Sequence, residues 1–484
     1  MSLSLPISFS TFATVVARAG LALALPLGAC SLVPTYTRPA LPLADHFDGA
    51  PPTALADATP VRSEWWRVYQ DSALDALVAH SLRNNFSLAA AIAAVEEARG
   101  NAEKAGAPRY PSLALGATFD RSHQGGGGSQ SSTSKSQSVF GAASYETDFW
   151  GFNAANANAA VSLAQASAFD RDTVAVTLAA SVVNTYFEIQ CLRRRLALAH
   201  TVADAASRVL QLILAQQQAG VATELQVQQQ RNALATFQSA VPALQLQLEQ
   251  SLHALAVLIG RAPEQLAIGE APLSVIPIPV PQADIPASML EMRPDIRSKE
   301  ATLQAANFNV GAARAAFFPN IVLTADSGLS SKSLTRFLSS PFASIAASLA
   351  APIFDGGALR GQLHANRAAA DKSVADYQQT VITALQDVED SLSAAHQQQL
   401  AEVSDQAAAV AAQRAAVLAA AQYRYGTVDF LTVLDAQRTS YQAQDTLVQT
   451  RLRRLQASVG LFRAFGGGFG VAAPGTALTS SSNP

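Results

Sequence analysis

Charged side chains are scarce in this 484-residue sequence, where Asp, Glu, Lys and Arg together make up 14% of the residues. The 33 basic and 36 acidic residues leave a net charge of −3, and no long basic run occurs. We therefore do not expect nucleic-acid binding. The apolar fraction of 49% is ample for large buried surfaces, so the chain is not expected to be disordered.

Cysteine is almost absent, and the two that occur, Cys30 and Cys191, cannot build a disulfide framework or a cysteine-rich metal site. Cys191, within "YFEIQCLRRRL", is expected to be a small buried residue on a helix. The seven histidines are scattered without ligand spacing. No metal and no cofactor are therefore expected.

Catalytic motifs are also missing, since the sequence contains no P-loop, nucleophile elbow, HExxH or CxxC. The "GGGFG" beginning at Gly466 follows an expected helix, not a strand. This context excludes a dinucleotide-binding loop and predicts a flexible helix exit instead. We do not expect an enzyme.

The first 29 residues contain no acid and one base, Arg18, around the apolar core "AGLALALPLGA". That core is too short to span a bilayer as a helix, so the segment is expected to be an export signal. Its end, "LGAC", resembles the lipobox of bacterial lipoproteins, which implies cleavage before Cys30 and attachment of lipid to this residue. The alternative is an ordinary signal peptide that ends near a cysteine.

An internal repeat organises the rest of the chain, with four blocks recurring in the same order about 206 residues later. The paired blocks are "APRYPSLALGATFD" with "AAFFPNIVLTADSG", "DFWGFNAANANAA" with "IFDGGALRGQLHANRAAA", "AGVATELQVQQQR" with "YGTVDFLTVLDAQR", and "LIG" with "AFG". The fold is therefore expected to be a duplicated unit.

Each repeat contains two runs in which apolar and polar residues alternate, the period of a β-strand. In the first repeat the runs are Pro111 to Ser122 and Ser138 to Phe149, and in the second they lie around Ile321 to Asp326 and Ser344 to Ile353. Their lengths suit tilted transmembrane strands. Four strands cannot close a barrel, and an open edge cannot stand in lipid, so the chain is expected to oligomerise. A soluble sandwich with one wet face is the alternative.

A very long helix is expected after each strand pair, from Phe152 to about Gln218 and from Leu359 to about Arg424. The first carries an uncharged seam with 4,3 spacing, typical of a coiled coil: Leu178, Val182, Thr185, Ile189, Leu192, Leu196, Ala199, Ala203, Ala206, Leu210 and Ile213. The returning arms, Leu225 to Gly260 and Phe430 to Phe465, are shorter. We therefore expect further helices, about Leu88 to Ala107 and Pro294 to Ala316, to stack end-on above these short arms.

The stretch "YRYGTVDFLTVLDAQR", from Tyr423 to Arg438, interrupts the second long helix with Gly426 and then resumes with Asp429 and Asp435. Its counterpart in the first repeat has Gly220 at the turn. Both breaks are therefore expected to be turns between helical arms, with Asp429 capping the helix that follows.

Together with the lipobox and the repeated strand pairs and hairpins, four motifs resemble the outer-membrane efflux proteins of the TolC superfamily, specifically the NodT-type lipoprotein branch. The motifs are "CSLVPTYTRP", "EWWRVYQDSALDALVAHSLRNNFSLAAA", "RPDIRSKEATLQAANFNVGAARAAFFPNIVLTADSG" and "YRYGTVDFLTVLDAQR". The resemblance implies a homotrimer with a twelve-stranded transmembrane β-barrel, four strands per chain, continuous with a long periplasmic α-helical barrel.

The resemblance also implies a function as the passive exit duct of a tripartite efflux system. Its partners would be a periplasmic adaptor protein, a proton-driven inner-membrane transporter and outer-membrane lipid. Its cargo would be small toxic compounds such as antibiotics or aromatic acids, with the fusaric acid resistance subgroup as one candidate. The alternative is a trimeric coiled-coil surface adhesin, and a peripheral enzyme is a weaker one.

Site residues follow from the same resemblance. They are the gate residues Tyr423, Asp429 and Asp435, the adaptor-contact tip of Gly220, Thr223, Gly426 and Arg438, the lumen acids Asp120, Glu146, Asp148 and Asp326, and the lipidated Cys30. Val428 and Thr432 replace charged residues that some family members carry there. Because the first repeat has Glu224 but lacks the paired Asp residues, the second hairpin is the candidate moving half of the gate.

The expected order of segments combines the repeat with this resemblance. It is a signal peptide (1–29), a lipidated N-terminal segment and equatorial region (30–87), a helix (88–110), the first strand pair (111–150), the first long hairpin (151–261), an equatorial linker (262–292), a helix (293–317), the second strand pair (318–355), the second long hairpin (356–466) and a flexible C-terminal tail (467–484).

Overall fold

The structure is a computed structural model that describes residues 32–41, 47, 63–124, 132–265, 268–269, 272–279, 289–331 and 340–468. The expected signal peptide, Cys30 and the loops at 125–131 and 332–339 lie outside the described residues.

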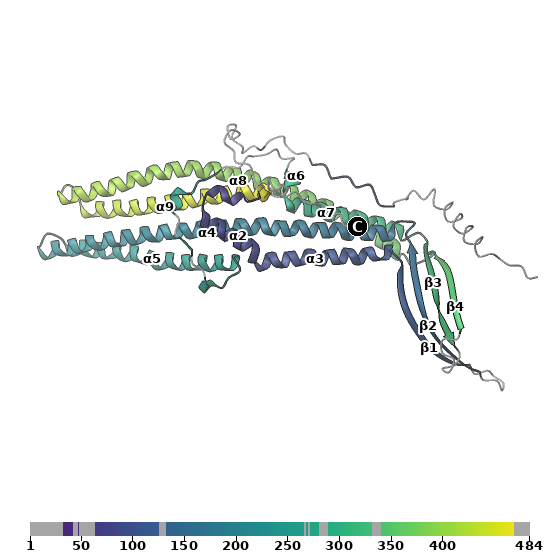
Figure 1. Cartoon of the computed structure of the whole chain (residues 1–484). Helices are drawn as coiled ribbons and strands as arrows, with labels where there is room; N and C mark the ends of the chain where they lie inside the picture. Colours follow the sequence, from purple (N-terminus) through teal and green to yellow (C-terminus); the bar gives the residue numbers. More distant parts are fainter. Residues whose placement is uncertain are drawn as a thin grey trace, which may run out of the picture. The chain divides into compact units, whose positions relative to one another are not determined.

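Helices and strands follow one another in the order that the repeat predicts (Figure 1). In chain order they are α2 (Ser72–Asn84), α3 (Phe86–Gly106), β1 (Ser112–Gln124), β2 (Ser132–Thr147), α4 (Phe152–Gln218), α5 (Glu224–Leu258), α6 (Met289–Met292), α7 (Pro294–Ala315), β3 (Asn320–Ser331), β4 (Ser340–Ala350), α8 (Ala358–Arg424) and α9 (Phe430–Ala464). Short 3₁₀ turns include η1 (Trp65–Tyr69) and η7 (Gly466–Gly468).

The chain divides into two compact units, and each draws segments from both repeats. The strand unit comprises Met1–Pro39, Glu96–Ala166 and Lys299–Tyr377, and the hairpin unit comprises Ala40–Val95, Ser167–Ser298 and Gln378–Pro484. The duplication is therefore not a division into two domains.

In the strand unit, the four strands form one antiparallel sheet in the order β1-β2-β3-β4. The central β2–β3 pairing joins the two repeats and places Tyr145 opposite Leu323 and Ala142 opposite Asp326. Apolar side chains alternate onto one face, and several are largely exposed: Leu113 82%, Leu115 84%, Phe119 69%, Ile345 89% and Leu349 67%. A sheet face this apolar and this exposed is suited to lipid, because in water it would be an aggregation hazard.

In the hairpin unit, α4 turns back as α5 and α8 turns back as α9, and the two helical hairpins run side by side (Figure 1). The predicted seam of α4 faces the interior, since Val182, Ile189 and Ile213 are fully buried. A buried seam of uncharged residues, with polar residues on the outer side of the helix, holds long helices together without a globular core.

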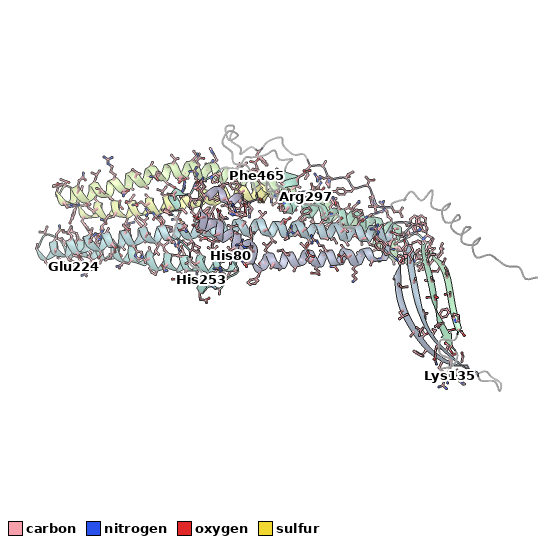
Figure 2. All side chains as sticks on the ribbon, viewed as in Figure 1. His80, Lys135, Glu224, His253, Arg297 and Phe465 are labelled. Carbon is pink, nitrogen blue, oxygen red and sulfur yellow. The ribbon has the colours of Figure 1, made fainter. Side chains whose placement is uncertain are left out.

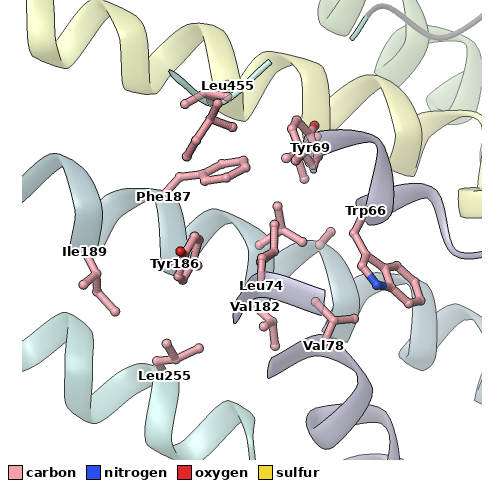
Figure 3. Packing of buried hydrophobic residues seen from close by; sticks show 14 of the residues in the cluster. Trp66, Tyr69, Leu74, Val78, Val182, Tyr186, Phe187, Ile189, Leu255 and Leu455 are labelled. Carbon is pink, nitrogen blue, oxygen red and sulfur yellow. The ribbon is translucent and has the colours of Figure 1, made fainter. Parts of the chain in front are cut away.

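The hairpin unit encloses a buried cluster rich in aromatic residues (Figure 3). The Trp65 ring stacks on Phe462 at 5.3 Å between centroids, and Tyr69 meets Phe187 edge-on at 5.0 Å. The polar ends of the buried tyrosines are paired, because the Tyr69 hydroxyl donates to Ser458 Oγ at 3.0 Å and the Tyr186 hydroxyl donates to Asp71 Oδ2 at 2.6 Å. These contacts fix η1 to α4 and α9, and α4 to the start of α2.

The ends of the short arms α5 and α9 closely meet the residues just before the helices α3 and α7. Asn85 Nδ2 and Ser81 Oγ donate to the carbonyl of Leu258, the last residue of α5, at 3.0 and 2.7 Å. In the second repeat Arg293 Nη1 donates to the carbonyl of Ala464, the last residue of α9, at 3.2 Å. These donors satisfy helix-end carbonyls that lack intrahelical partners. The structure thus shows both junctions.

The glycines after α9 differ from the expectation of a flexible helix exit. Gly466, Gly467 and Gly468 are buried, and all three have positive φ angles, which glycine adopts without strain. A Cβ on Gly466 would lie 2.2 Å from the carbonyl oxygen of Met292. The expectation of flexibility is therefore wrong for these residues, and 469–484 lie outside the described residues.

Candidate functional site

The two turns at the ends of the long helices have the same backbone geometry. The Val221 N–H donates to the Gln216 carbonyl at 2.8 Å, and the Thr427 N–H donates to the Gln422 carbonyl at 3.0 Å. Gly220 and Gly426 occupy the left-handed position with φ of 75° and 71°. This is the Schellman ending of a helix, in which glycine is the least strained residue.

The helices that follow the turns are capped differently. In the first hairpin the Gln226 N–H donates to Thr223 Oγ1 and the Thr223 N–H donates to Gln226 Oε1, forming a capping box. The neighbouring Glu224 lies at the free end of this hairpin (Figure 2). Its carboxylate accepts from Gln217 and Gln228, which holds its pKa below the ordinary value. Thr223 and Glu224 therefore fix the local shape of the turn.

Asp429 is the N-cap of α9, as the sequence predicts. One carboxylate oxygen accepts from the Thr432 N–H at 2.9 Å and from the Thr432 hydroxyl. These hydrogen bonds hold the pKa of the Asp429 carboxyl below its ordinary value. Thr432, expected only as a departure from the charged residue of other family members, is thus the hydrogen-bond partner of the Asp429 carboxylate.

Asp429, Asp435 and Arg438 line one groove of about 970 Å³ between α5, α8 and α9. Gln229, Asn232 and Thr236 of α5 form its opposite wall. Asp435 and Arg438 are exposed. The structure therefore brings two of the three expected gate residues and one expected adaptor-contact residue into the same groove near the second turn.

Tyr423 lies on the other side of the turn, half-buried, with its ring 5.6 Å from that of Phe430. Its hydroxyl is 3.5 Å from Gln216 Oε1 on α4, so Tyr423 reaches from the second hairpin to the first. Beneath this contact lies a buried cluster from both hairpins, which we call the tip cluster: Ala203, Ala206, Ile213, Val227, Ala233, Phe237, Phe430 and Leu434.

The sequence pattern did not identify the residues of the first hairpin that contact Tyr423 or contribute to the tip cluster. Gln216 stands in a run of three glutamines, and Phe237 is one apolar residue of an amphipathic arm. Phe237 meets Tyr441 of α9 edge-on at 5.6 Å. Pairings between helices far apart in sequence leave no local signal, so only the structure reveals them.

Three of the four expected lumen acids lie on the polar face of the sheet. Asp120 is opposite Ser136, and Asp326 is opposite both Ala142 and Ser344. Glu146 lies on the same face, opposite Val322. The other face is the apolar one described above and carries none of these acids, whereas Phe140, Val322 and Phe342 share the face of the acids.

Asp148 differs from these three because it follows the last residue of β2. Its two carboxylate oxygens accept from the N–H groups of Asn153 and Ala154 at 3.0 and 2.6 Å. It therefore occupies the start of α4, where a carboxylate stabilises free helix N–H groups.

In the described part of the chain, no group of three or more His, Cys, Asp or Glu could hold a metal ion. Cys191 is buried, and burial raises the pKa of its thiol to about 12. A buried thiol that stays protonated is unreactive, so Cys191 contributes only to packing.

A sheet with one apolar face and one acidic face, together with two long helical hairpins, defines an outer-membrane channel protein. Comparison with known proteins agrees, since the family described as Outer membrane efflux protein matches residues 77–261 and 285–467. The chain belongs to this family.

Several relatives share most of their length with this chain. The pyoverdine export outer membrane protein OpmQ of Pseudomonas aeruginosa is 37% identical over 431 residues, covering 86% of this chain and 89% of the relative. The outer membrane protein OprJ of the same species is 34% identical over 459 residues, covering 93% and 95%. The probable efflux pump outer membrane protein TtgC of Pseudomonas putida is 32% identical over 459 residues, covering 92% and 93%.

Solved structures show the same fold. The outer-membrane channel OprN superposes with a TM-score of 0.85 at 30% identity, covering 91% of this chain and 99% of that chain. CusC, described with transmembrane channel formation, superposes with a TM-score of 0.82 at 28% identity, covering 91% and 100%. The recognition, the fold class and the outer-membrane location expected from the sequence are thereby confirmed. The chain is an outer-membrane efflux channel protein.

Proposed function

We propose that this protein is the passive exit duct of a tripartite efflux system, receiving small toxic compounds from an inner-membrane transporter through a periplasmic adaptor. The observation that carries the proposal is the segregation on the sheet, with an exposed apolar face on one side and Asp120, Glu146 and Asp326 on the other. Such a wall suits a water-filled passage through lipid.

The passage requires three copies of the chain in this proposal. Among the described residues, β1 and β4 pair on one side only, so each sheet offers two open edges. Backbone N–H and C=O groups at an open edge find no hydrogen-bond partners in lipid. Joining the sheets edge to edge pairs these groups and leaves no open edge. Three four-stranded sheets give the twelve-stranded barrel that the resemblance implies.

The gate is proposed to lie at the two turns. Three copies would repeat Asp429 and Asp435 around the axis, and rings of acids attract cations in narrow pores. Opening requires the second hairpin to move from the first, which breaks the Tyr423–Gln216 contact and loosens the tip cluster. The exposed tip of Gly220, Thr223, Gly426 and Arg438 is proposed as the adaptor contact.

Lipid attachment at Cys30 completes the proposal, and it rests on the lipobox-like "LGAC". Labelling of growing cells with a radioactive fatty acid tests it, because Cys30→Ser should abolish incorporation. Incorporation that persists in this variant would exclude Cys30 as the attachment site.

The test of the exit-duct function is co-purification combined with a deletion strain. Crosslinked, solubilised membranes should yield the protein with a periplasmic adaptor and an inner-membrane transporter, and Arg438→Glu should reduce adaptor recovery. The deletion strain should become sensitive to members of a panel of antibiotics, solvents and aromatic acids. Recovery without either partner, and unchanged sensitivity to every compound, would contradict the proposal.

A further inference from the structure

A cavity of about 840 Å³ lies where α4 meets α8 and α9, within the hairpin unit (Figure 1). Pro272 and Leu273, from the segment that follows α5, form part of its wall. Its volume is within the range of sites for small molecules. No described residue lines both this cavity and the groove at the second turn, so the two are separate.

Arginine dominates the polar part of the lining. Arg193 and Arg194 come from α4, and Arg451 comes from α9. Arg193 donates to the carbonyls of Gly269 and Ile268 at 2.6 and 3.0 Å. These partners are uncharged, so they leave the positive charge of Arg193 uncompensated.

Glu402 of α8 is the one acid among the described residues that line the cavity, and two arginines share it. Its Oε1 accepts from Arg451 Nη1 at 3.0 Å, and its Oε2 accepts from Arg454 Nη1 at 2.6 Å. Four guanidinium groups at or beside the cavity therefore accompany a single carboxylate.

Two further acids near this level are engaged elsewhere. Asp405 of α8 accepts from the Thr450 hydroxyl at 2.7 Å, and Asp445 of α9 forms an ion pair with Arg195 at 2.7 Å. Neither of them lines the cavity. The cavity thus carries an excess of positive charge, which favours an anionic ligand.

Two of the arginines also have donors to spare. Arg451 Nη2 donates to the Ile276 carbonyl at 2.7 Å, but the Arg451 Nε is buried and has no hydrogen-bond partner in the described part of the chain. A buried donor without an acceptor costs stability. Arg194 is exposed and makes no hydrogen bond or ion pair with any described residue. An oxyanion in the cavity offers acceptors to both side chains.

Apolar side chains supply much of the remaining lining, and they lie on both hairpins and on the segment between them: Ala197, Leu273, Leu447 and Val448. An inorganic anion would leave this wall in contact with water. A short hydrocarbon chain would cover it, and each buried methylene group strengthens binding about fourfold. The lining therefore favours an organic anion.

We propose that this cavity binds a small organic acid, with Arg194 and Arg451 contacting its carboxylate and the apolar wall covering its hydrocarbon chain. Guanidinium groups bind carboxylates through charge-assisted hydrogen bonds, often in pairs. The ligand contacts α4 of the first hairpin and α8 and α9 of the second, so it holds the two hairpins together. The site requires neither the gate nor the exit duct proposed above.

Equilibrium dialysis of the purified, solubilised full-length protein against radioactive hexanoate tests the site, with protein-free micelles as the background. The natural protein should bind hexanoate saturably, one molecule per chain. Acetate lacks most of the hydrocarbon chain and should bind more than about tenfold more weakly. Hexanol lacks the charge and should not compete.

Arg194→Gln should weaken hexanoate binding about tenfold or more, because it removes the exposed cation and leaves the ion pairs of Glu402 in place. The matched control is Arg208→Gln, since Arg208 is an exposed arginine of the same helix that does not line the cavity. This control should bind as the natural protein does.

Gln406→Glu should abolish binding by placing a carboxylate on the α8 wall of the cavity, where Gln406 is exposed. Helical circular dichroism verifies that each variant is folded. Hexanoate should also slow hydrogen exchange of peptides covering 190–197 and 447–454 in the natural protein and in Arg208→Gln, but not in Arg194→Gln.

Uptake no greater than that of protein-free micelles, equal binding of acetate and hexanoate, or full binding by Arg194→Gln would each overturn the proposal. Failure of the exit-duct function has a different signature. In that case hexanoate binding persists, while deletion of the protein leaves the cells' sensitivity to every compound unchanged.

Discussion

At the scale of single residues, Asp429 has one role in the structure, as a helix cap, and one proposed role, in the gate, and a substitution to alanine would remove both. Its carboxylate caps α9 through Thr432, and it lies in the same groove as Asp435. The cap shapes the turn of one chain, whereas the proposed gate role depends on the charge of Asp429 in the pore that three chains are proposed to form. Asparagine caps helices about as well as aspartate but carries no charge, so it separates the two roles.

We predict that Asp429→Asn and Asp435→Asn each weaken the cation preference of the channel in planar bilayers, because each removes a ring of negative charge. Asp429→Ala should weaken the preference equally and also raise conductance, since it loosens the start of α9 as well. Asp435→Ala should raise conductance by removing an acidic side chain from the proposed gate. Unchanged conductance and selectivity in both alanine variants would contradict the placement of the gate.

The capped state of Asp429 should also depend on pH. Hydrogen bonds in the folded state lower the pKa of the Asp429 carboxyl from the ordinary 3.8. The ionised carboxylate therefore stabilises the folded tip fully above pH 3.8, and this stabilisation is lost as the pH falls through the lower pKa of the folded state. Hydrogen exchange of the tip peptide, corrected for intrinsic rates, should therefore accelerate below about pH 4. Asp429→Asn should show a flat profile there, and an equal acceleration in both proteins would assign the effect to another group.

At the scale of helices and strands, boundaries set by local chemistry were predictable and contacts between distant elements were not. The sequence placed the end of α4 at Gln218 and the start of α9 at Phe430, where the structure has them, because glycine and cap residues act over a few positions. The strands were less accurate, since β2 ends at Thr147 and β4 at Ala350, whereas alternation suggested Phe149 and Ile353. The alternation of apolar and polar residues extends past these strand ends because the turns that follow also carry exposed apolar residues, Phe149 and Ile353.

The tie between the hairpins illustrates what local patterns miss. Arg195 of α4 makes a bidentate pair with Asp445 of α9, with distances of 2.7 and 3.1 Å and side chains 22% and 9% exposed. Gln449 adds a hydrogen bond to the same carboxylate at 2.6 Å. In the sequence, Arg195 is only the last residue of "RRR".

We predict that Arg195→Ala destabilises the hairpins by about 3 kcal/mol, because it leaves Asp445 buried without its cation. The double variant Arg195→Met, Asp445→Leu should recover most of the loss. Chemical denaturation followed by helical circular dichroism measures both. As a control, Arg99→Ala removes an exposed pair with Glu96 and should change stability by less than about 1 kcal/mol. A loss in Arg195→Ala no larger than in the control would show that the tie is not stabilising.

At the scale of the whole molecule, the duplicated sequence is used to build one sheet and two hairpins, not two separate halves. The β2–β3 pairing joins the repeats in the strand unit, and Arg195–Asp445 joins them in the hairpin unit. Strand pairs from both repeats in one sheet argue against a stalked adhesin, which would need a single anchor at one chain end. The open strand edges and the proposed ring of tip acids both require neighbouring copies for their function.

The most direct test of the central claim is the accumulation of a fluorescent efflux substrate in energised cells that lack this protein. We predict that the deletion strain accumulates the dye, because its inner-membrane transporter alone does not export it. Reintroducing the natural protein should restore export. Equal accumulation with and without the protein, for every dye and compound tested, would contradict its role as an exit duct.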